Sequence, residues 1–174
     1  MNTFRTLWKL NITLLALIML LARQVQTAAA DQPIRQPLPL DPFTISGVCD
    51  FDVAVDILAN KEVATTFTDQ EGNLTQQLVT GVFKFRLTNL STGESLDLNI
   101  SGPGRTVFAP DGSFTIFGEG RWLWPVPEGI SSNVPAGLFL IVGHHVVEFD
   151  AAGNITEFTA EGGQVVAVCA ALAG

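Results

Sequence analysis

Alternation of apolar and polar side chains with a period of two residues dominates the chain from residue 48 onward. The stretch CDFDVAVDIL (49–58) has three aspartates at even positions and apolar residues at odd ones, and VFKFRLT (82–88) and SFTIFGEGRWLW (113–124) repeat the scheme. This period is typical of strands, whose side chains point to opposite faces in turn. No window after residue 30 has the i, i+3, i+4, i+7 stripe of an amphipathic helix. The sequence therefore predicts an all-β domain of half-buried antiparallel strands.

Three similar segments predict hairpin turns between these strands. FAPDGSFT (108–115) and FDAAGNIT (149–156) share Phe, then Gly four residues later, then a small polar residue, an apolar residue and Thr, and FTDQEGNLT (67–75) has one residue inserted. Glycine supplies the positive φ that a type I turn followed by a bulge requires. Between the turn signals we expect about eight to ten strands, over 48–58, 61–68, 74–80, 82–88, 94–101, 104–109, 113–124, 137–149, 155–160 and 163–169.

The N-terminus has the three parts of a secretory signal peptide. Arg5 and Lys9 precede an apolar run over residues 12–22, and Ala28 and Ala30 stand at the small-residue positions before a cleavage site. The apolar run is shorter than the roughly 20 residues that span a bilayer. We therefore expect cleavage near Ala30 (signal peptide 1–30), a secreted, extracellular protein and no stable membrane insertion afterwards.

A proline-rich segment follows the predicted cleavage site. DQPIRQPLPLDPF (31–43) holds four of the nine prolines. Such a composition predicts an extended N-terminal leader over residues 31–46 that spaces the domain from its cleavage site. A single β domain is then expected over residues 47–174.

Both cysteines, Cys49 and Cys169, lie in the part predicted to be exported, where a disulfide between them is expected. Cys49 opens the first predicted strand and Cys169 ends the last, so a bridge fits pairing of the first strand with the last. This favours a closed or nearly closed antiparallel β-barrel of about eight to ten strands, lipocalin-like or allene-oxide-cyclase-like in general architecture. A two-sheet β-sandwich is the alternative.

The charge of the mature chain argues against polyanionic partners. All seventeen acidic residues lie beyond Ala30, whereas three of the nine basic residues precede it, which leaves six. Binding to phosphates needs clusters of Lys and Arg. We therefore predict no nucleic-acid partner and interpret the acidity as a solubilising surface.

The two histidines are adjacent, so a regular strand points them to opposite faces and they cannot hold one metal ion together. His145 would share a face with Phe139 and Phe149, and His144 would lie on the other, unless a bulge at Gly143 changes the facing. No CxxC, HxxxH or HxH motif is present, and Asp50, Asp52 and Asp56 lack the spacing of a calcium loop. Neither a metal site nor a cofactor is predicted.

Glu119 is the carboxylate whose surroundings first suggest chemistry, because it lies between Gly118 and Gly120, where a substrate or a backbone segment can approach. The alternation places it outward beside Arg121, which favours a surface ion pair. Glu119 and His145 are the two weak candidates for a catalytic acid or base. No nucleophile motif or phosphate-binding loop accompanies them.

The stretch WLWPVPEGISSNVPAG (122–137) is the better candidate for a binding site. Trp122 and Trp124 share one face at a strand end, before a long loop with three prolines. Aromatic side chains at a strand end can line the opening of a ligand pocket. We therefore assign Trp122, Trp124, Phe139 and His145 as candidate ligand-binding residues. The alternative is that both tryptophans simply fill the core.

Several segments of the chain resemble a group of small exported bacterial proteins of uncharacterised function, actinobacterial in type. They are CDFDVAVDILANKE (49–62), NISGPGR (99–105), PDGSFTIFGEGRWLW (110–124), VVEFDAAGNITEF (146–158) and VCAALAG (168–174). The resemblance covers nearly all of the mature chain. Its motifs are structural, so it implies an exported β domain and assigns no catalytic residue.

Three functional hypotheses follow. The first is a non-enzymatic binder of a small apolar or amphipathic ligand at the Trp122 and Trp124 end. The second is a cyclase or isomerase acting on a hydrophobic substrate, with His145 or Glu119 as acid or base. The third is a cell-surface or self-associating module, suggested by residues 138–142, which are apolar on both faces. The sequence leaves the oligomeric state open.

Overall fold

The computed structural model describes residues 32–174, so the predicted signal peptide and its cleavage site lie outside the described residues. The regular secondary structure of this part is almost entirely strand. Its elements are β1 (Ile34–Pro37), β2 (Phe43–Ile45), β3 (Val53–Asn60), β4 (Val63–Thr68), β5 (Leu74–Thr80), β6 (Phe83–Asn89), β7 (Ser95–Asn99), β8 (Gly104–Phe108), β9 (Phe114–Gly118), β10 (Arg121–Val126), β11 (Gly137–Phe149), β12 (Ile155–Ala167) and α2 (Val168–Leu172). No helix in this part is long and apolar enough to cross a membrane.

The strands form two antiparallel sheets. The larger sheet has the order β1-β4-β5-β8-β9-β11-β10, with β12 also paired to β11, and the smaller has the order β2-β3-β6-β7. The prediction of an all-β antiparallel domain is confirmed. Neither sheet closes on itself, so the barrel is not confirmed, and the two sheets fit the alternative of a two-sheet sandwich.

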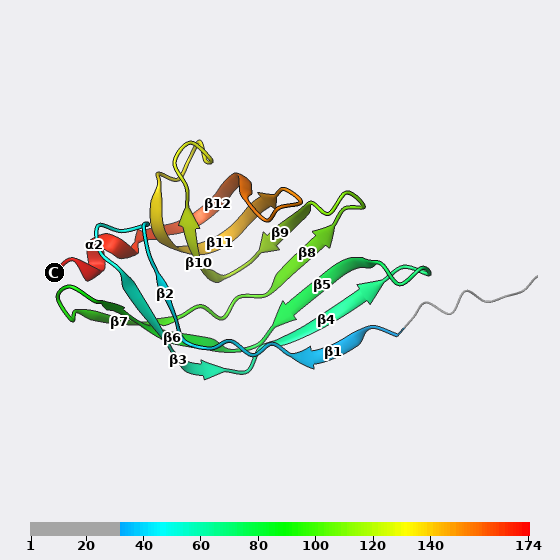
Figure 1. Cartoon of the computed structure of the whole chain (residues 1–174), viewed down its shortest axis with the longest axis horizontal. Helices are drawn as coiled ribbons and strands as arrows, with labels where there is room; N and C mark the ends of the chain where they lie inside the picture. Colours follow the sequence, from blue (N-terminus) through cyan, green and yellow to red (C-terminus); the bar gives the residue numbers. More distant parts are fainter. Residues whose placement is uncertain (1–31) are drawn as a thin grey trace, which may run out of the picture. The chain divides into compact units, whose positions relative to one another are not determined.

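Three pairs of strands continue from one sheet into the other. β3 leads into β4, β5 into β6 and β7 into β8, and each pair bends at a short connection (Figure 1). The register of β3 with β6 continues into that of β4 with β5, so residues 53–89 form one long hairpin that belongs to both sheets. Gly81 lies at its bend with φ of 145°, where a Cβ atom would overlap the backbone of Lys61 and Glu62.

The proline-rich leader is extended, but it also contains two strands that its composition did not predict. β1 pairs with β4 at the edge of the larger sheet, and β2 pairs with β3 at the edge of the smaller one. Proline is tolerated at sheet edges, where its missing N–H costs no ladder hydrogen bond. Residues 38–43, which we call the strap, connect these two strands and include Phe43, the first residue of β2.

The predicted disulfide between Cys49 and Cys169 is confirmed, with the Cα atoms 5.5 Å apart. Among the described strands, however, β3 and β12 do not pair, so the inference that the bridge marks first-to-last pairing is wrong. Cys49 precedes β3, and Cys169 lies in α2, which continues from β12. The bridge thus joins the connection between β2 and β3 of the smaller sheet to the helix that follows β12 of the larger sheet.

Some element boundaries also differ from the predictions. The stretch 113–124 is two strands, β9 and β10, because Gly120 takes φ of 80° between them. Residues 155–167 form one strand with a register shift beside Gly162 and Gly163, and the helix α2 that follows was not predicted. The turn glycines Gly72, Gly112 and Gly153 have the expected positive φ, from 83° to 89°.

The apolar stretch at residues 138–142 is explained by two core clusters, one on each face of β11. Leu138 packs with Val53, Phe85 and Leu87 of the smaller sheet and with Leu172 of α2. Phe139 and Ile141 pack on the opposite face with Val147 and Phe158. Other parts of the same chain therefore cover both faces of this stretch, which leaves no exposed apolar patch here.

Candidate functional site

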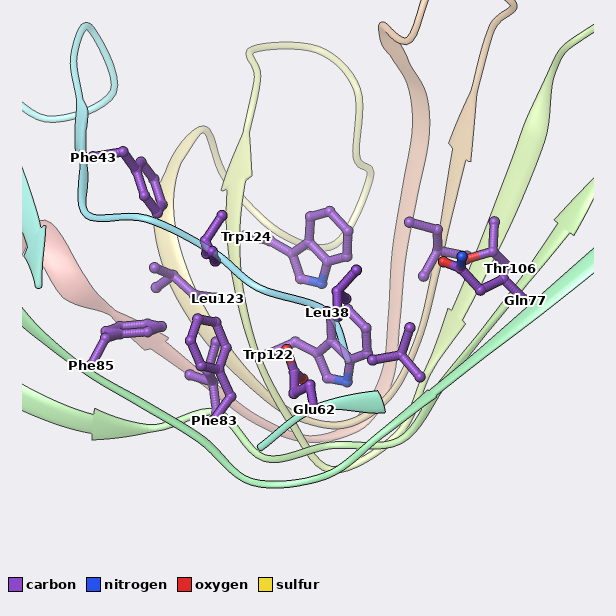
Figure 2. Close-up of a pocket in the computed structure, with 14 residues that line it drawn as sticks. Leu38, Phe43, Glu62, Gln77, Phe83, Phe85, Thr106, Trp122, Leu123 and Trp124 are labelled. Atoms are coloured by element: carbon purple, nitrogen blue, oxygen red, sulfur yellow. The ribbon is translucent and has the colours of Figure 1, made fainter. Parts of the chain in front are cut away.

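An apolar pocket of about 330 Å³ lies between the strap and the strands at the junction of the two sheets (Figure 2). The strap contributes Leu38, Leu40 and Phe43, the smaller sheet contributes Phe83 and Phe85, and the larger sheet contributes Val79, Thr106, Ile116, Trp122 and Trp124. The strap side chains are 37%, 46% and 44% exposed, respectively, so they border the opening.

Trp122 and Trp124 form one wall of the pocket. They lie two residues apart on β10 and so share a face, with indole rings nearly parallel (5°) and centroids 5.8 Å apart. Trp122 donates a hydrogen bond from Nε1 to the carbonyl of Glu119 at 3.1 Å. Its ring lies against Gly102 and Gly104, where any Cβ atom would overlap the indole. The glycines of NISGPGR therefore make room for Trp122.

His145 lies behind the tryptophans rather than in the pocket. It is fully buried, meets both indoles edge-on and stacks on Phe158. Burial lowers the pKa of His145 to about 4, and a hydrogen bond with the carbonyl of Gly143 only partly offsets this. The imidazole is thus neutral at pH 7, and its Nε2 has no hydrogen-bond partner among the described residues. In this position it has no contact with the pocket interior.

Phe139 also lies outside the pocket. It is directly opposite Trp124 in the β10–β11 register and is buried in the second core cluster. Of the four candidate ligand-binding residues, the structure therefore places Trp122 and Trp124 in the pocket wall and Phe139 and His145 behind it. The facing predicted for the histidines holds. The register shift lies around Gly143, between Val142 and His144, but the extra residue is on β12, at Gly162 and Gly163, so the alternation along β11 is kept.

Glu119 and His144 meet on the opposite face of the larger sheet. The alternation predicted that Glu119 pairs with Arg121. In the structure its partner is His144 instead, with the His144 Nδ1 and Glu119 Oε1 atoms 2.7 Å apart. Both side chains are partly exposed and border a second hollow of about 320 Å³. Because the sheet separates them from the tryptophans, Glu119 and His145 do not form one site.

Two polar features of the pocket were missed in the sequence. Glu62, in the short connection between β3 and β4, is the one charged residue among those that line it, and burial raises the pKa of this carboxyl group. Gln77 and Thr106 lie opposite each other in the β5–β8 register and add polar atoms. The alternation in PLPL (37–40) was the signal that could have placed Leu38 and Leu40 on one face.

The acidic and histidine side chains of the described residues are spread over the molecule. Within residues 32–174, no three His, Cys, Asp or Glu side chains come together as a metal site would require. Of the three aspartates considered for calcium, Asp56 lies opposite Arg86, whose guanidinium forms two hydrogen bonds with Asp97 at 2.7 and 2.9 Å.

No protein-family model, curated protein or solved structure matches this chain. Its function has to be inferred from the chemistry of the pocket.

Proposed function

We propose that this protein is a secreted, non-enzymatic binder of a small apolar or amphipathic molecule, which it holds in the pocket beneath the strap. The observation that carries the proposal is the apolar pocket walled by the stacked indoles of Trp122 and Trp124. Its volume of about 330 Å³ falls in the range of small-molecule sites, which are concave and mostly apolar with a few polar groups.

The size of the pocket bounds the ligand and its affinity. At a packing density of about 0.74, this volume accepts roughly a dozen non-hydrogen atoms of a saturated molecule, or a few more of a flat aromatic one, whose carbon atoms carry fewer hydrogens. A ligand that loses about 250 Å² of apolar surface to the pocket gains roughly 6 kcal/mol, which corresponds to a dissociation constant of tens of micromolar. Stacking on an indole face would add to this.

Secretion is supported by the signal-peptide pattern at residues 1–30 together with the disulfide between Cys49 and Cys169. Disulfides persist in oxidising compartments outside the cytoplasm. A binder in that environment meets small molecules in the medium, which fits a pocket that opens beside exposed apolar residues of the strap.

We place binding ahead of catalysis because of where the candidate acids and bases lie. A cyclase or isomerase would need an acid or base within reach of its substrate. His145 lies behind the tryptophans, and Glu119 lies on the other face of the sheet. Neither of them lines the pocket, and Glu62, the one acid that does, has no second acid or base beside it among the lining residues.

The tryptophans themselves provide the assay. The chain has three tryptophans and no tyrosine, and the third tryptophan, Trp8, belongs to the predicted signal peptide. After removal of residues 1–30, ultraviolet-excited emission therefore comes from the pocket wall. Pyrene, an apolar probe that absorbs in the range of indole emission, should quench this emission saturably, with one probe bound per chain.

Two variants on β8 make the test specific. Thr106→Phe puts a large side chain into the pocket and should abolish pyrene binding, whereas Val107→Phe adds the same side chain on the opposite, exposed face and should leave binding unchanged. Unsaturable quenching, or equal binding by Thr106→Phe and the wild type, would contradict the proposal.

A further inference from the structure

Glu62 is held rigidly at the edge of the pocket by its backbone. Its N–H donates to the side-chain oxygen of Asn60 at 3.0 Å, and its carbonyl accepts from the N–H of Leu38 at 3.1 Å. The first bond closes the β3–β4 bend, and the second connects it to the strap, where Asn60 also donates from Nδ2 to the carbonyl of Leu38 at 2.8 Å. In Figure 2 the Glu62 side chain extends from the strand corner into the pocket. The fold therefore fixes the backbone of Glu62 at the edge of the pocket.

The carboxylate of Glu62 has no partner among the described residues. No hydrogen bond or ion pair reaches it, although Arg86 and His144 each have a carboxylate partner elsewhere. Glu62 is half-buried at the edge of a mostly apolar pocket, and on its other side it borders a hollow that Asn60 and Lys61 also line. A carboxylate in such a place loses hydration without gaining a compensating contact, and this is a net cost to the folded chain.

A cation entering the pocket would offset that cost. An ammonium group next to Glu62 forms a charge-assisted hydrogen bond in surroundings where water screens it little. The indole faces of Trp122 and Trp124 add an attraction, because tryptophan is the aromatic side chain that binds cations best. An anionic head group would meet repulsion from Glu62 instead. The tryptophan faces and the carboxylate of Glu62 therefore both favour a ligand with a positive charge.

We propose that the pocket takes amphipathic amines: an apolar body of roughly a dozen non-hydrogen atoms that lies against the tryptophans, with one protonated amine that pairs with Glu62. This inference rests on the proposed function, because it names the ligand class of the same pocket. Fatty acids of equal length and neutral alcohols are the compounds that the pocket discriminates against.

Three ligands that differ only in the head group test the proposal. Decylamine, decanol and decanoate are titrated at neutral pH into the chain lacking residues 1–30, with displacement of pyrene as the readout. For the wild type we expect decylamine to bind at least about tenfold more tightly than decanol, and decanoate most weakly, since a charge-assisted hydrogen bond contributes roughly 1.5 to 3 kcal/mol.

The isosteric variant Glu62→Gln should bring decylamine to the affinity of decanol while leaving decanol binding intact, which also shows that the pocket is still folded. Glu94→Gln, which removes an exposed carboxylate outside the pocket, should retain the wild-type preference and so control for general attraction of amines to an acidic protein.

The possible failures are distinguishable. Equal binding of the three ligands to the wild type, or an amine preference that survives in Glu62→Gln, overturns the assignment of amines and leaves the apolar binding function in place. Failure of pyrene and all three ligands to bind overturns both proposals.

Discussion

A buried, neutral histidine makes the stability of this protein depend on pH. The pKa of His145 falls from 6.5 to about 4 on folding, because burial disfavours the imidazolium. The unfolded chain therefore takes up a proton at a pH where the folded chain does not. Stability is fully present above pH 6.5 and is lost as the pH falls towards 4, by about 3 kcal/mol in total.

The variant His145→Leu tests this prediction by removing the titrating group from the core. Urea unfolding at pH 7 and pH 4.5 should show that the wild type loses about 2 kcal/mol more stability over this interval than the variant does. Val107→Phe, which changes an exposed side chain on β8 and leaves His145 in place, should keep the acid-induced loss of the wild type. An identical pH dependence in the wild type and His145→Leu would show that the imidazole is not held neutral.

The face of the sheet on which a side chain lies could be predicted wherever the two-residue strand period alone determines it. Trp122 and Trp124 share a face because they are two positions apart, and His144 and His145 are separated for the same reason. Glu62 could not be found in this way. Its place in the pocket depends on a bend between two strands and on a leader segment 22 to 24 residues earlier in the chain, and neither has a local signature.

The strap is the element whose role is hardest to see from sequence and easiest to test. Leu40 lines the pocket yet is 46% exposed, so Leu40→Ala should weaken pyrene binding by about three- to tenfold through lost apolar contact. Thermal unfolding should change little, since the side chain is outside the core.

Ile34→Ala is the matched control for the strap. Ile34 is 61% exposed on β1 of the same leader but does not line the pocket. Its truncation should leave the pyrene titration unchanged. If Ile34→Ala weakened binding as much as Leu40→Ala, the effect would belong to docking of the leader as a whole and not to contact with the ligand.

The strands were largely predictable from alternation and turn chemistry, whereas their breaks were not. Asp69 and Asp150 each accept hydrogen bonds from backbone N–H groups two and four residues later, so the turns are set by local side chains. The break at Gly120 and the register shift at Gly162 depend on partner strands instead. Helix α2 was missed because five residues are too few for a helical period.

At the scale of the whole molecule, the disulfide fastens the two sheets together. It spans 120 residues of sequence, and α2 brings Cys169 to the first core cluster, where Asn89 donates a hydrogen bond to the carbonyl of Leu172 at 3.0 Å. Closing a loop of this length stabilises a folded chain by about 4 to 5 kcal/mol in the chain-entropy model.

The double variant Cys49→Ser/Cys169→Ser should therefore lose about 4 kcal/mol of unfolding free energy, measured by urea denaturation. A reducing agent should produce the same loss in the wild type and no further loss in the variant. A loss below about 1 kcal/mol would mean that packing of α2 alone holds the sheets together.

Sheet closure could not be derived from the cysteines because each lies just beyond a strand. Pairing of strand ends and bridging of flanking segments place the two Cα atoms at similar distances, here 5.5 Å. The two arrangements differ in whether the strands bend into a second sheet, as they do here after β3, β5 and β7 (Figure 1). Such a bend depends on long-range packing and has no signal in the cysteine positions.

We propose above all that the pocket beneath the strap binds a small apolar or amphipathic molecule. Native mass spectrometry of the protein recovered from its producer's culture medium tests this most directly. We expect a small organic adduct on the wild type and on Val107→Phe, and its absence from Thr106→Phe. A bare chain in all three, or the same adduct on Thr106→Phe, would contradict the account.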